Sequence, residues 1–236
     1  MGDVWAGLQQ GIHLLLLGDI AFWEIILLSA QVSGIALVIS AVLGIPTGAF
    51  LGLMRFPGRR VLQAIVYTGM GFPPVVVGLA VYLLLSRNGV LGPANLTWVP
   101  DLFTVPAMIL AQVIIATPLV VGFTMSAVSD VDPNLRLQLR SLGATSWQAT
   151  WAILREARHG VLVALIGGFG SVISEVGAVT MVGGNIEHST RVLTTAIVLE
   201  TRRGNLEMAI GLGMVMLGMA FLINLSVAQL HGKGRR

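Results

Sequence analysis

Long uncharged apolar stretches, separated by short polar segments, run along most of the 236-residue chain. A helix that crosses the hydrocarbon core of a bilayer needs about 20 apolar residues. Five stretches reach this length, and only one of them contains a charged residue, Glu175: Ile25–Met54, Val61–Ser86, Leu102–Ser129, Val161–Val182 and Met208–Leu230. We therefore predict an all-α membrane protein with about five transmembrane helices.

The composition agrees with a membrane protein and excludes several kinds of site. Hydrophobic residues make up 55% of the chain and charged residues only 11%, whereas soluble domains have about 25% charged residues. Cysteine is absent, so disulfides and thiolate chemistry are excluded. The four histidines are too scattered to form a metal cluster, and no nucleic-acid signature is present. We expect this chain to bind no metal and no cofactor.

The two ends of the chain differ from its middle. The first apolar stretch has 30 residues, so we expect it to tilt or to break near Gly44-Ile45-Pro46. Residues 1–24 hold a shorter apolar run and lack the pattern of a signal peptide, so we predict an uncleaved interfacial segment there. Residues 25–230 then form the transmembrane domain, and residues 231–236 form a basic cytoplasmic tail.

Basic residues predict the orientation in the membrane, because lysine and arginine accumulate in cytoplasmic loops. With an odd number of spans and the C-terminus in the cytoplasm, four basic residues lie outside: Arg87, Arg191, Arg202 and Arg203. Ten lie inside: Arg55, Arg59, Arg60, Arg136, Arg140, Arg155, Arg158, Lys233, Arg235 and Arg236. We therefore predict that the N-terminus is outside and the C-terminus is cytoplasmic.

The cytoplasmic loop 132–159 is predicted to form two short helices joined by a bend. Asp132 and Pro133 are typical of a helix start, and Gly143 interrupts the helix that follows. Ser146 is then placed to cap a second helix, which carries Trp147 and Trp151 on one side. The apolar side of this loop either packs back on its own bundle or docks a soluble partner, and the residues alone leave both readings open.

The segment "VDPNLRLQLRSLGATSWQATWAIL" (131–154) resembles the coupling loop of permease subunits of ATP-binding-cassette importers. In that family the loop has a Glu-Ala-Ala start followed by a conserved glycine bend, and it seats in a cleft of the ATPase subunit. Leu137-Gln138-Leu139 stands in place of Glu-Ala-Ala here. The resemblance implies that these residues couple to an ATPase: Arg140, Leu142, Gly143, Ala144, Ser146 and Trp147.

The resemblance covers nearly the whole chain and extends to one branch of the family. The segments "GFPPVVVGLAVYLLLSRNGVLGP" (71–93), "MILAQVIIATPLVVGF" (108–123) and "ISEVGAVTMVGGNIEHSTRVLTTAIVLETRRGNLEMA" (173–209) are similar to the permeases for molybdate, tungstate and sulfate. They are most similar to tungstate permeases. The resemblance implies a type I importer permease fold and a path for a tetrahedral oxyanion, with tungstate favoured and molybdate or sulfate as alternatives.

The same resemblance implies the partners. We do not expect an enzyme, because an intramembrane enzyme would need paired acids, a Ser/His arrangement or a metal set, and only the lone Glu175 is available. A separate ATPase subunit, present in two copies, would use the ATP, and an extracytoplasmic binding protein would deliver the anion. The permease itself would be a multi-pass homodimer in the cell membrane, surrounded by lipid. A stand-alone anion channel or secondary transporter is the alternative, but it would need charges on several spans or two inverted halves, and neither is visible.

A further set of residues is expected to line the pathway or its gate. Glu175 lies inside an apolar span, where an ionised group costs about 2.5–3.5 kcal/mol. Because a carboxylate repels an oxyanion, we favour a structural role, in which Glu175 is tied to a nearby backbone group, over direct anion binding. Hydroxyl and backbone N–H donors between the fourth and fifth spans suit an oxyanion better: Ser174, Gly183, Gly184, Asn185 and Thr190. Pro73 and Pro74 in the second span free backbone carbonyls, and we expect them to form a second lining of the pathway.

Glycines recur at a spacing of four in the first apolar stretch. Gly44, Gly48 and Gly52 lie on one face of a helix and leave it flat. Small residues at this spacing let two membrane helices approach closely. We predict that this face packs against another helix.

Overall fold

The computed structural model describes residues 20–92 and 99–232, and every regular element within these ranges is a helix. Most of the predicted interfacial segment and of the basic tail lies outside the described residues. The helices in chain order are α2 (Ile20–Leu53), α3 (Arg59–Met70), α4 (Pro74–Leu85), α5 (Val105–Ser129), α6 (Pro133–Ser141), α7 (Ser146–Glu156), α8 (Arg158–Ile173), α9 (Gly177–Gly183), α10 (Leu193–Arg202) and α11 (Leu206–Gly232).

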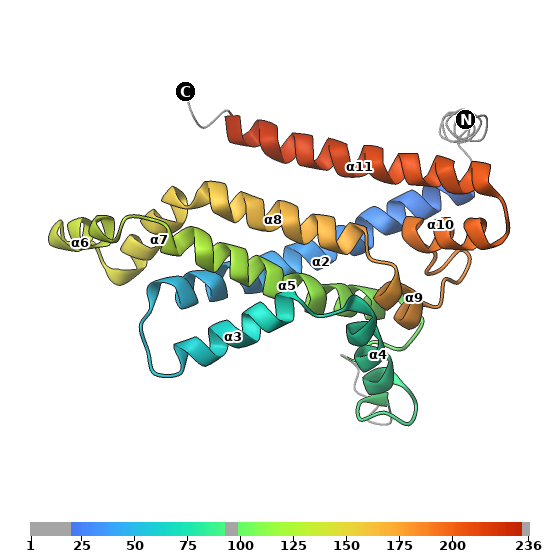
Figure 1. The fold of residues 1–236 in the computed structure, drawn as a ribbon, viewed down its shortest axis with the longest axis horizontal. Coiled ribbons are helices and arrows are strands. Elements are labelled where there is room, and N and C mark those ends of the chain that lie inside the picture. Colours follow the sequence, from blue (N-terminus) through green and yellow to red (C-terminus); the bar gives the residue numbers. More distant parts are fainter. Residues whose placement is uncertain (1–19, 93–98, 233–236) are drawn as a thin grey trace.

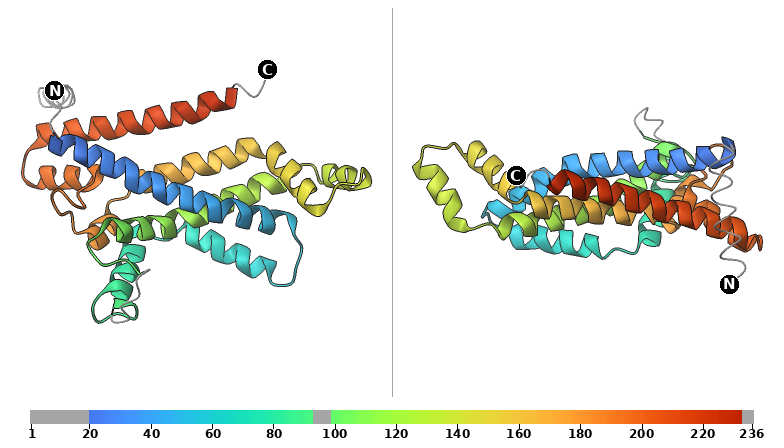
Figure 2. Two further views of the ribbon diagram at one scale, coloured as in Figure 1. Left: turned by 180° about the vertical axis from the view of Figure 1, so that it is seen from behind. Right: turned by 90° about the horizontal axis from the view of Figure 1, so that it is seen from above.

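Helices α2, α5 and α8 form the body of the molecule. Figure 1 shows α2, α5 and α8 running beside one another along the long axis, and Figure 2 shows the same arrangement from two other sides. The short helices α6 and α7 lie at one end of this body, and α9 and α10 lie at the opposite end. Helix α4 projects steeply from the body, and α11 packs on α10.

The predicted glycine face is confirmed, and its partner is α5. A Cβ atom added to Gly48 would lie 2.6 Å from the carbonyl oxygen of Val121, and one added to Gly44 would lie 2.8 Å from Cγ1 of Val120. At Gly52 the added atom would be 3.0 Å from the carbonyl oxygen of Met125. At Gly48 and Gly52 the backbone of α2 therefore lies directly against the backbone of α5, and at Gly44 it lies against the Val120 side chain.

The first apolar stretch forms one unbroken helix, so the break considered near Pro46 is absent. Helix α2 has 34 residues and contains Pro46 in its interior. Gly44 and Gly48 lie on either side of this proline, and both press against α5. This packing holds the helix together across the one backbone hydrogen bond that proline removes.

The second apolar stretch, predicted as one span, is two helices. Helices α3 and α4 meet at an angle of 100°. The cause is local: Gly71 ends α3, Pro73 precedes α4, and Pro74 is the first residue of α4. Two consecutive prolines cannot continue the hydrogen bonds of α3, whereas proline is well suited to start a new helix.

The fourth apolar stretch is also interrupted. Helix α8 ends at Ile173 and α9 begins at Gly177, so the predicted span 161–182 is divided near Glu175. Within residues 20–92 and 99–232, three helices are long and apolar enough to cross a membrane by themselves: α2, α5 and α11. The number rises to five if each bent pair, α3 with α4 and α7 with α8, is one span. The prediction of about five spans agrees with the upper count.

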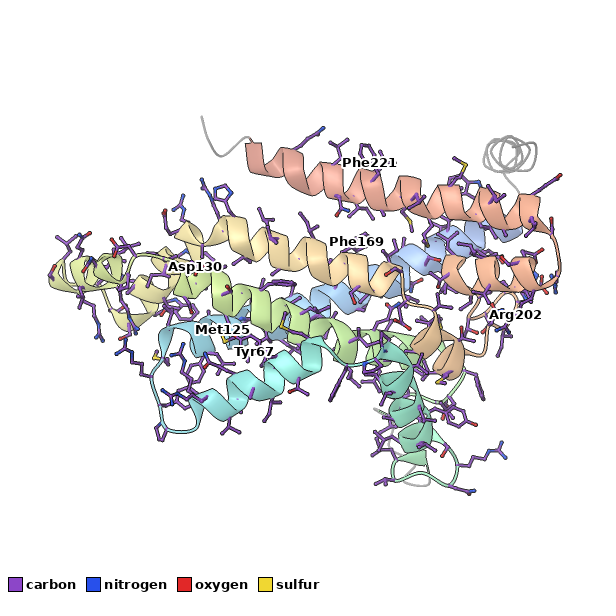
Figure 3. All side chains as sticks on the ribbon, viewed as in Figure 1. Tyr67, Met125, Asp130, Phe169, Arg202 and Phe221 are labelled. Carbon is purple, nitrogen blue, oxygen red and sulfur yellow. The ribbon has the colours of Figure 1, made fainter. Side chains whose placement is uncertain are left out.

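The core continues along both ends of α5. Toward α9, Met108 of α5 is fully buried among Val32, Val81 and Val179, which come from α2, α4 and α9. Toward α6, Met125 of α5 (Figure 3) is buried, and its sulfur is 3.5 Å from Nε2 of Gln63 in α3. Helix α5 is thus the central helix on which the other elements pack.

The contact between α2 and α5 predicts a large difference between two glycine-to-alanine changes in the same helix. Gly48→Ala forces a methyl group into a backbone carbonyl, so we expect the free energy of unfolding to fall by about 1–3 kcal/mol. Gly34→Ala is the control, because an added Cβ at Gly34 has nothing within 4 Å. Thermal unfolding in detergent measures both, and equal stability of the two variants would contradict the close packing.

Candidate functional site

The loop 132–159 forms the predicted helix, glycine bend and second helix. The Asp132 side chain accepts a hydrogen bond from the Asn134 amide at 2.9 Å and caps α6. Gly143 follows α6 with a φ angle of 87°, in the left-handed region that favours glycine. We call residues 133–156, with Gly143 near their centre, the elbow.

The start of α7 corrects one detail of the prediction. The capping residue is Thr145 and not Ser146, because Ser146 is already helical. The Thr145 hydroxyl accepts from the Gln148 amide at 3.3 Å, and Gln148 Oε1 accepts from the Thr145 amide at 2.8 Å. The Ser146 hydroxyl is instead 3.2 Å from Nη2 of Arg140 and accepts its hydrogen bond. Arg140 and Ser146 therefore brace the two helices across the bend.

The elbow has one packed face and one exposed face. Ile153 of α7 is buried against Ala49 of α2 and Val128 of α5, and Ala149 of α7 is also buried. On the other side, four large apolar residues are more than 60% exposed, and we call them the elbow face: Leu137, Leu142, Trp147 and Trp151. Packing on the bundle thus accounts for only part of the apolar surface that the sequence shows.

At the opposite end, the two interrupted helices meet. A Cβ added to Gly177, the first residue of α9, would lie 2.6 Å from Cγ2 of Val75 in the first turn of α4. One added to Gly78 would lie 2.5 Å from Cα of Ala178. The bend at Pro73 and Pro74 therefore lies beside the break at Glu175, although the two are about a hundred residues apart in the sequence.

Glu175 has the structural partner that the sequence analysis favoured. Its side chain is 8% exposed, and its Oε1 accepts a hydrogen bond from the Ala178 amide at 2.8 Å. Its own carbonyl accepts from the Thr194 hydroxyl at 2.9 Å, which joins the break to α10. The neighbouring Ser174 is exposed, and its hydroxyl donates back to Gly170 of α8 at 2.7 Å. The Glu175 side chain therefore satisfies a backbone amide in the first turn of α9.

The turn between α9 and α10 is fastened by Thr190. Its hydroxyl is buried, donates to the Gly183 carbonyl, and accepts from the Ile186 amide at 3.0 Å. Gly184 and Asn185 take positive φ angles of 74° and 51°. Thr190 and Gly183 thus satisfy each other, while the buried Oδ1 of Asn185 has no hydrogen-bond partner.

Sequence reasoning missed two polar residues that join this region to the long helices. Ser29 of α2 accepts from the Leu193 amide of α10 at 2.7 Å. Gln112 of α5 is 3% exposed, and its Nε2 donates to the Val172 carbonyl near the end of α8 at 3.0 Å. The available signal was a lone polar residue in an apolar span, which usually satisfies a backbone group.

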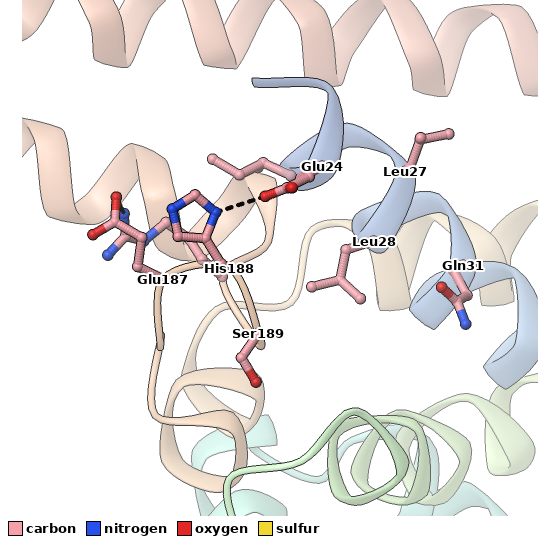
Figure 4. Close-up of a pocket in the computed structure, with 9 residues that line it drawn as sticks. Glu24, Leu27, Leu28, Gln31, Glu187, His188 and Ser189 are labelled. Carbon is pink, nitrogen blue, oxygen red and sulfur yellow. Dashed lines mark hydrogen bonds and ion pairs between the residues drawn. The ribbon is translucent and has the colours of Figure 1, made fainter. Parts of the chain in front are cut away.

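An ion pair on the surface joins the turn to the start of α2. His188 Nδ1 lies 2.7 Å from Oε2 of Glu24 (Figure 4), and both side chains are largely exposed. The pair borders a cavity of about 350 Å³, which Leu28, Gln31 and Arg191 also line. The hydrogen bond and the charge of Glu24 raise the pKa of His188 above its ordinary value.

Comparisons with known proteins agree with this architecture. The fold is similar to that of a bacterial alginate ABC transporter solved with an alginate-bound periplasmic protein, with a TM-score of 0.75 and 21% identity. That match covers 94% of this chain and 84% of the other. The family of binding-protein-dependent transport system inner membrane components matches residues 44–233. The chain belongs to this family and is a multi-pass inner-membrane protein with the fold of ABC importer permeases.

Two relatives are similar over nearly their whole length. A probable anion ABC transporter permease protein of Haloferax volcanii is 44% identical over 216 residues, covering 88% of this chain and 91% of the relative. The tungstate uptake system permease protein TupB of Peptoclostridium acidaminophilum is 38% identical over 225 residues, covering 95% and 96%. The resemblance to oxyanion permeases is confirmed.

The hydrogen bond from Ala178 to Glu175 predicts how two substitutions differ. Glu175→Ala leaves the Ala178 amide without its buried acceptor, so we expect the free energy of unfolding to fall by about 1–3 kcal/mol. Glu175→Gln keeps an oxygen at the same place and should recover most of that loss. Thermal unfolding in detergent compares them, and a Gln variant as unstable as the Ala variant would show that the acceptor is not what matters.

The pair of His188 and Glu24 predicts a pH-dependent contact. Because the folded-state pKa of His188 is raised, the pair stabilises the turn at low pH and is lost as the pH rises through that pKa. We expect NMR titration to give a pKa above 6.5, and Glu24→Gln to lower it. Arg191→Gln should raise it, because the Arg191 charge opposes protonation. A His188 pKa insensitive to Glu24→Gln would refute the pairing.

Proposed function

We propose that this chain is the permease subunit of an ATP-driven importer and forms the membrane path for a tetrahedral oxyanion, with tungstate the first choice. The observation that carries the proposal is the elbow: two capped helices, fixed by a glycine bend, present exposed apolar residues at one end of a packed helical body. The tungstate permease relative supports the choice of anion, and molybdate or sulfate are the alternatives within the same chemistry.

The elbow is proposed to dock on a separate ATPase subunit. Leu142 is 83% exposed and Trp147 is 77% exposed, and such aromatic and apolar side chains are typical anchors for a groove on a partner. Gly143 and Ala144 form the bend between them, and Arg140 with Ser146 holds its angle. Two permease copies would engage two ATPase copies, so that ATP binding draws the two elbows together. ATP is then bound and hydrolysed by the partner and not by this chain.

At the other end, the region around the two helix breaks is proposed to receive the anion from an extracytoplasmic binding protein. The alginate transporter was solved with such a protein. The Thr190 hydroxyl and several amides of the turn at 183–190 already have partners within it. The donors proposed for the oxyanion are therefore the side chains of Asn185 and Ser189, which can donate without holding the anion as tightly as a fixed arginine. Glu175 acts as the support of this region rather than as an anion ligand, because its carboxylate repels an anion.

The orientation is proposed from the distribution of arginines. Seven arginines lie on or beside the elbow end: Arg55, Arg59, Arg60, Arg136, Arg140, Arg155 and Arg158. Fewer lie toward α9 and α10. The elbow end is therefore assigned to the cytoplasm. This puts the start of α2 outside and the C-terminus inside.

A homodimer is proposed because one chain does not surround a path. Helices α3 and α4 and the bend between them carry many exposed apolar residues, among them Ile65, Phe72, Val76 and Leu79. A second copy or lipid can cover this surface. We assign the second copy to the part on α4, which lies beside the break at Glu175, so that the path would run between the two copies.

Docking through the elbow is tested at Gly143. Gly143→Val is strained because valine disfavours a positive φ angle, so we expect lower ATPase association and at least about tenfold slower uptake in proteoliposomes, the change that 1.4 kcal/mol produces. Gly143→Asn should retain both, because asparagine tolerates this conformation. Gly58→Val is the control outside the elbow, since Gly58 has the same φ angle of 87°. Normal association and uptake with Gly143→Val would refute the docking role.

The choice of anion is tested with the binding protein that delivers it. We expect that protein to retain tungstate at a lower concentration than molybdate or sulfate, as measured by calorimetry. The complete importer should then take up tungstate in an ATP-dependent way. Preferred retention of another oxyanion would replace tungstate without changing the class of the transporter.

A further inference from the structure

The last four backbone carbonyls of α2 accept hydrogen bonds from groups outside the helix. The last four carbonyl groups of any helix lack partners within it, and α2 has no basic residue in its last turn. The Phe50 carbonyl accepts from the Met54 amide at 2.9 Å. Arg59 of α3 donates to the carbonyls of Leu51 at 2.7 Å and Gly52 at 3.3 Å.

The remaining carbonyl is bound by the elbow. Nη1 of Arg136, in α6, donates to the Leu53 carbonyl at 2.7 Å, across 83 positions of sequence. The guanidinium also lies 4.0 Å from the Met54 sulfur. A guanidinium at a helix C-terminus is favoured both by the orphan carbonyl and by the helix dipole. Arg136 is half-buried and faces the bundle, whereas Arg140, one turn later, is exposed.

The opposite end of α2 is fixed to the anion side of the molecule. Ser29 accepts from the Leu193 amide of α10, and Glu24 pairs with His188 in the turn before α10. Between these ends, α2 is one helix of 34 residues that lies against α5 through its glycines. A displacement of its C-terminal end therefore moves the residues that hold the turn at 184–192.

We propose that Arg136 is the positioning residue that transmits movement of the elbow to α2, and through α2 to the turn at 184–192. This inference rests on the proposed function and deepens it. Chain continuity links α6 to α5 through Asp130–Asp132, but that link is a short non-helical connection. The Arg136 guanidinium adds a direct bond from α6 to α2, so that the elbow and α2 move together when the ATPase closes.

The test separates transmission from simple stabilisation. In the complete importer in proteoliposomes, Arg136→Met should leave assembly and ATP hydrolysis in place but lower the number of anions moved per ATP by about tenfold or more, the effect of losing a charged hydrogen bond. Arg136→Lys retains a charged donor and should restore most of the ratio. Arg59→Met is the matched control: it removes a cap from the same helix end but from α3, so it should lower stability and keep the ratio.

Two outcomes would overturn the inference. One is an unchanged ratio of anions to ATP in Arg136→Met, and the other is an equal fall of the ratio in Arg59→Met. Failure of the unmodified complex to transport at all would instead refute the proposed function.

A second measurement applies if Arg136→Met does not assemble. The chain has no cysteine, so spin labels at Arg55→Cys and Asn134→Cys report the distance between the end of α2 and α6 in the otherwise unmodified importer. We expect the same distance with and without trapped ATP. A resolved change of that distance between the two states would overturn the proposal.

Discussion

The backbone contact between α2 and α5 is the interaction on which the rest of this structure depends. In a bilayer, apolar side chains gain little by leaving lipid for protein, so helices associate through close van der Waals contact and hydrogen bonds. Gly44, Gly48 and Gly52 provide that contact along the C-terminal half of α2. The two helices consequently behave as one body, and every functional element described here is attached to one of them.

The interruptions of the helices are the second constraint, because each one exposes backbone groups that lipid cannot satisfy. At the break after α8, Glu175 accepts from the Ala178 amide, and Thr194 donates to the Glu175 carbonyl. Gln112 donates to the Val172 carbonyl one turn before the break. These polar side chains satisfy backbone groups, which accounts for an acidic residue in an apolar segment.

At both ends of the molecule, a polar side chain of one helix binds a backbone group of another helix. At the elbow end, arginines from α3 and α6 satisfy the carbonyls of α2. At the far end, the Ser29 hydroxyl satisfies an amide of α10. Because α2 spans the distance between them without a break, a change at the elbow and a change at the turn are mechanically related.

Several features followed from the sequence alone. The absence of charge over 25 residues or more fixed α2 and α5 as helices of membrane length, and the local sequence around Asp132, Pro133 and Gly143 determined the elbow, because caps and positive φ angles depend on a few neighbouring residues. The glycine spacing predicted a packed face but not its partner. The fold class followed from these patterns, whereas the family followed from the resemblance of the segments 71–93, 108–123, 131–154 and 173–209 to importer permeases.

Only the tertiary structure decided the rest. It divided the second and fourth stretches, because hydropathy does not show where an apolar helix bends. It also brought Val75 beside Gly177, from segments about a hundred residues apart. It also assigned partners to Ser29 and Arg136: Ser29 meets an amide 164 positions away, and Arg136 meets a carbonyl 83 positions away. A polar side chain in an apolar stretch indicates that a hydrogen-bond partner is needed. Which backbone group it meets is determined by how the helices cross, and that depends on all the packing contacts together.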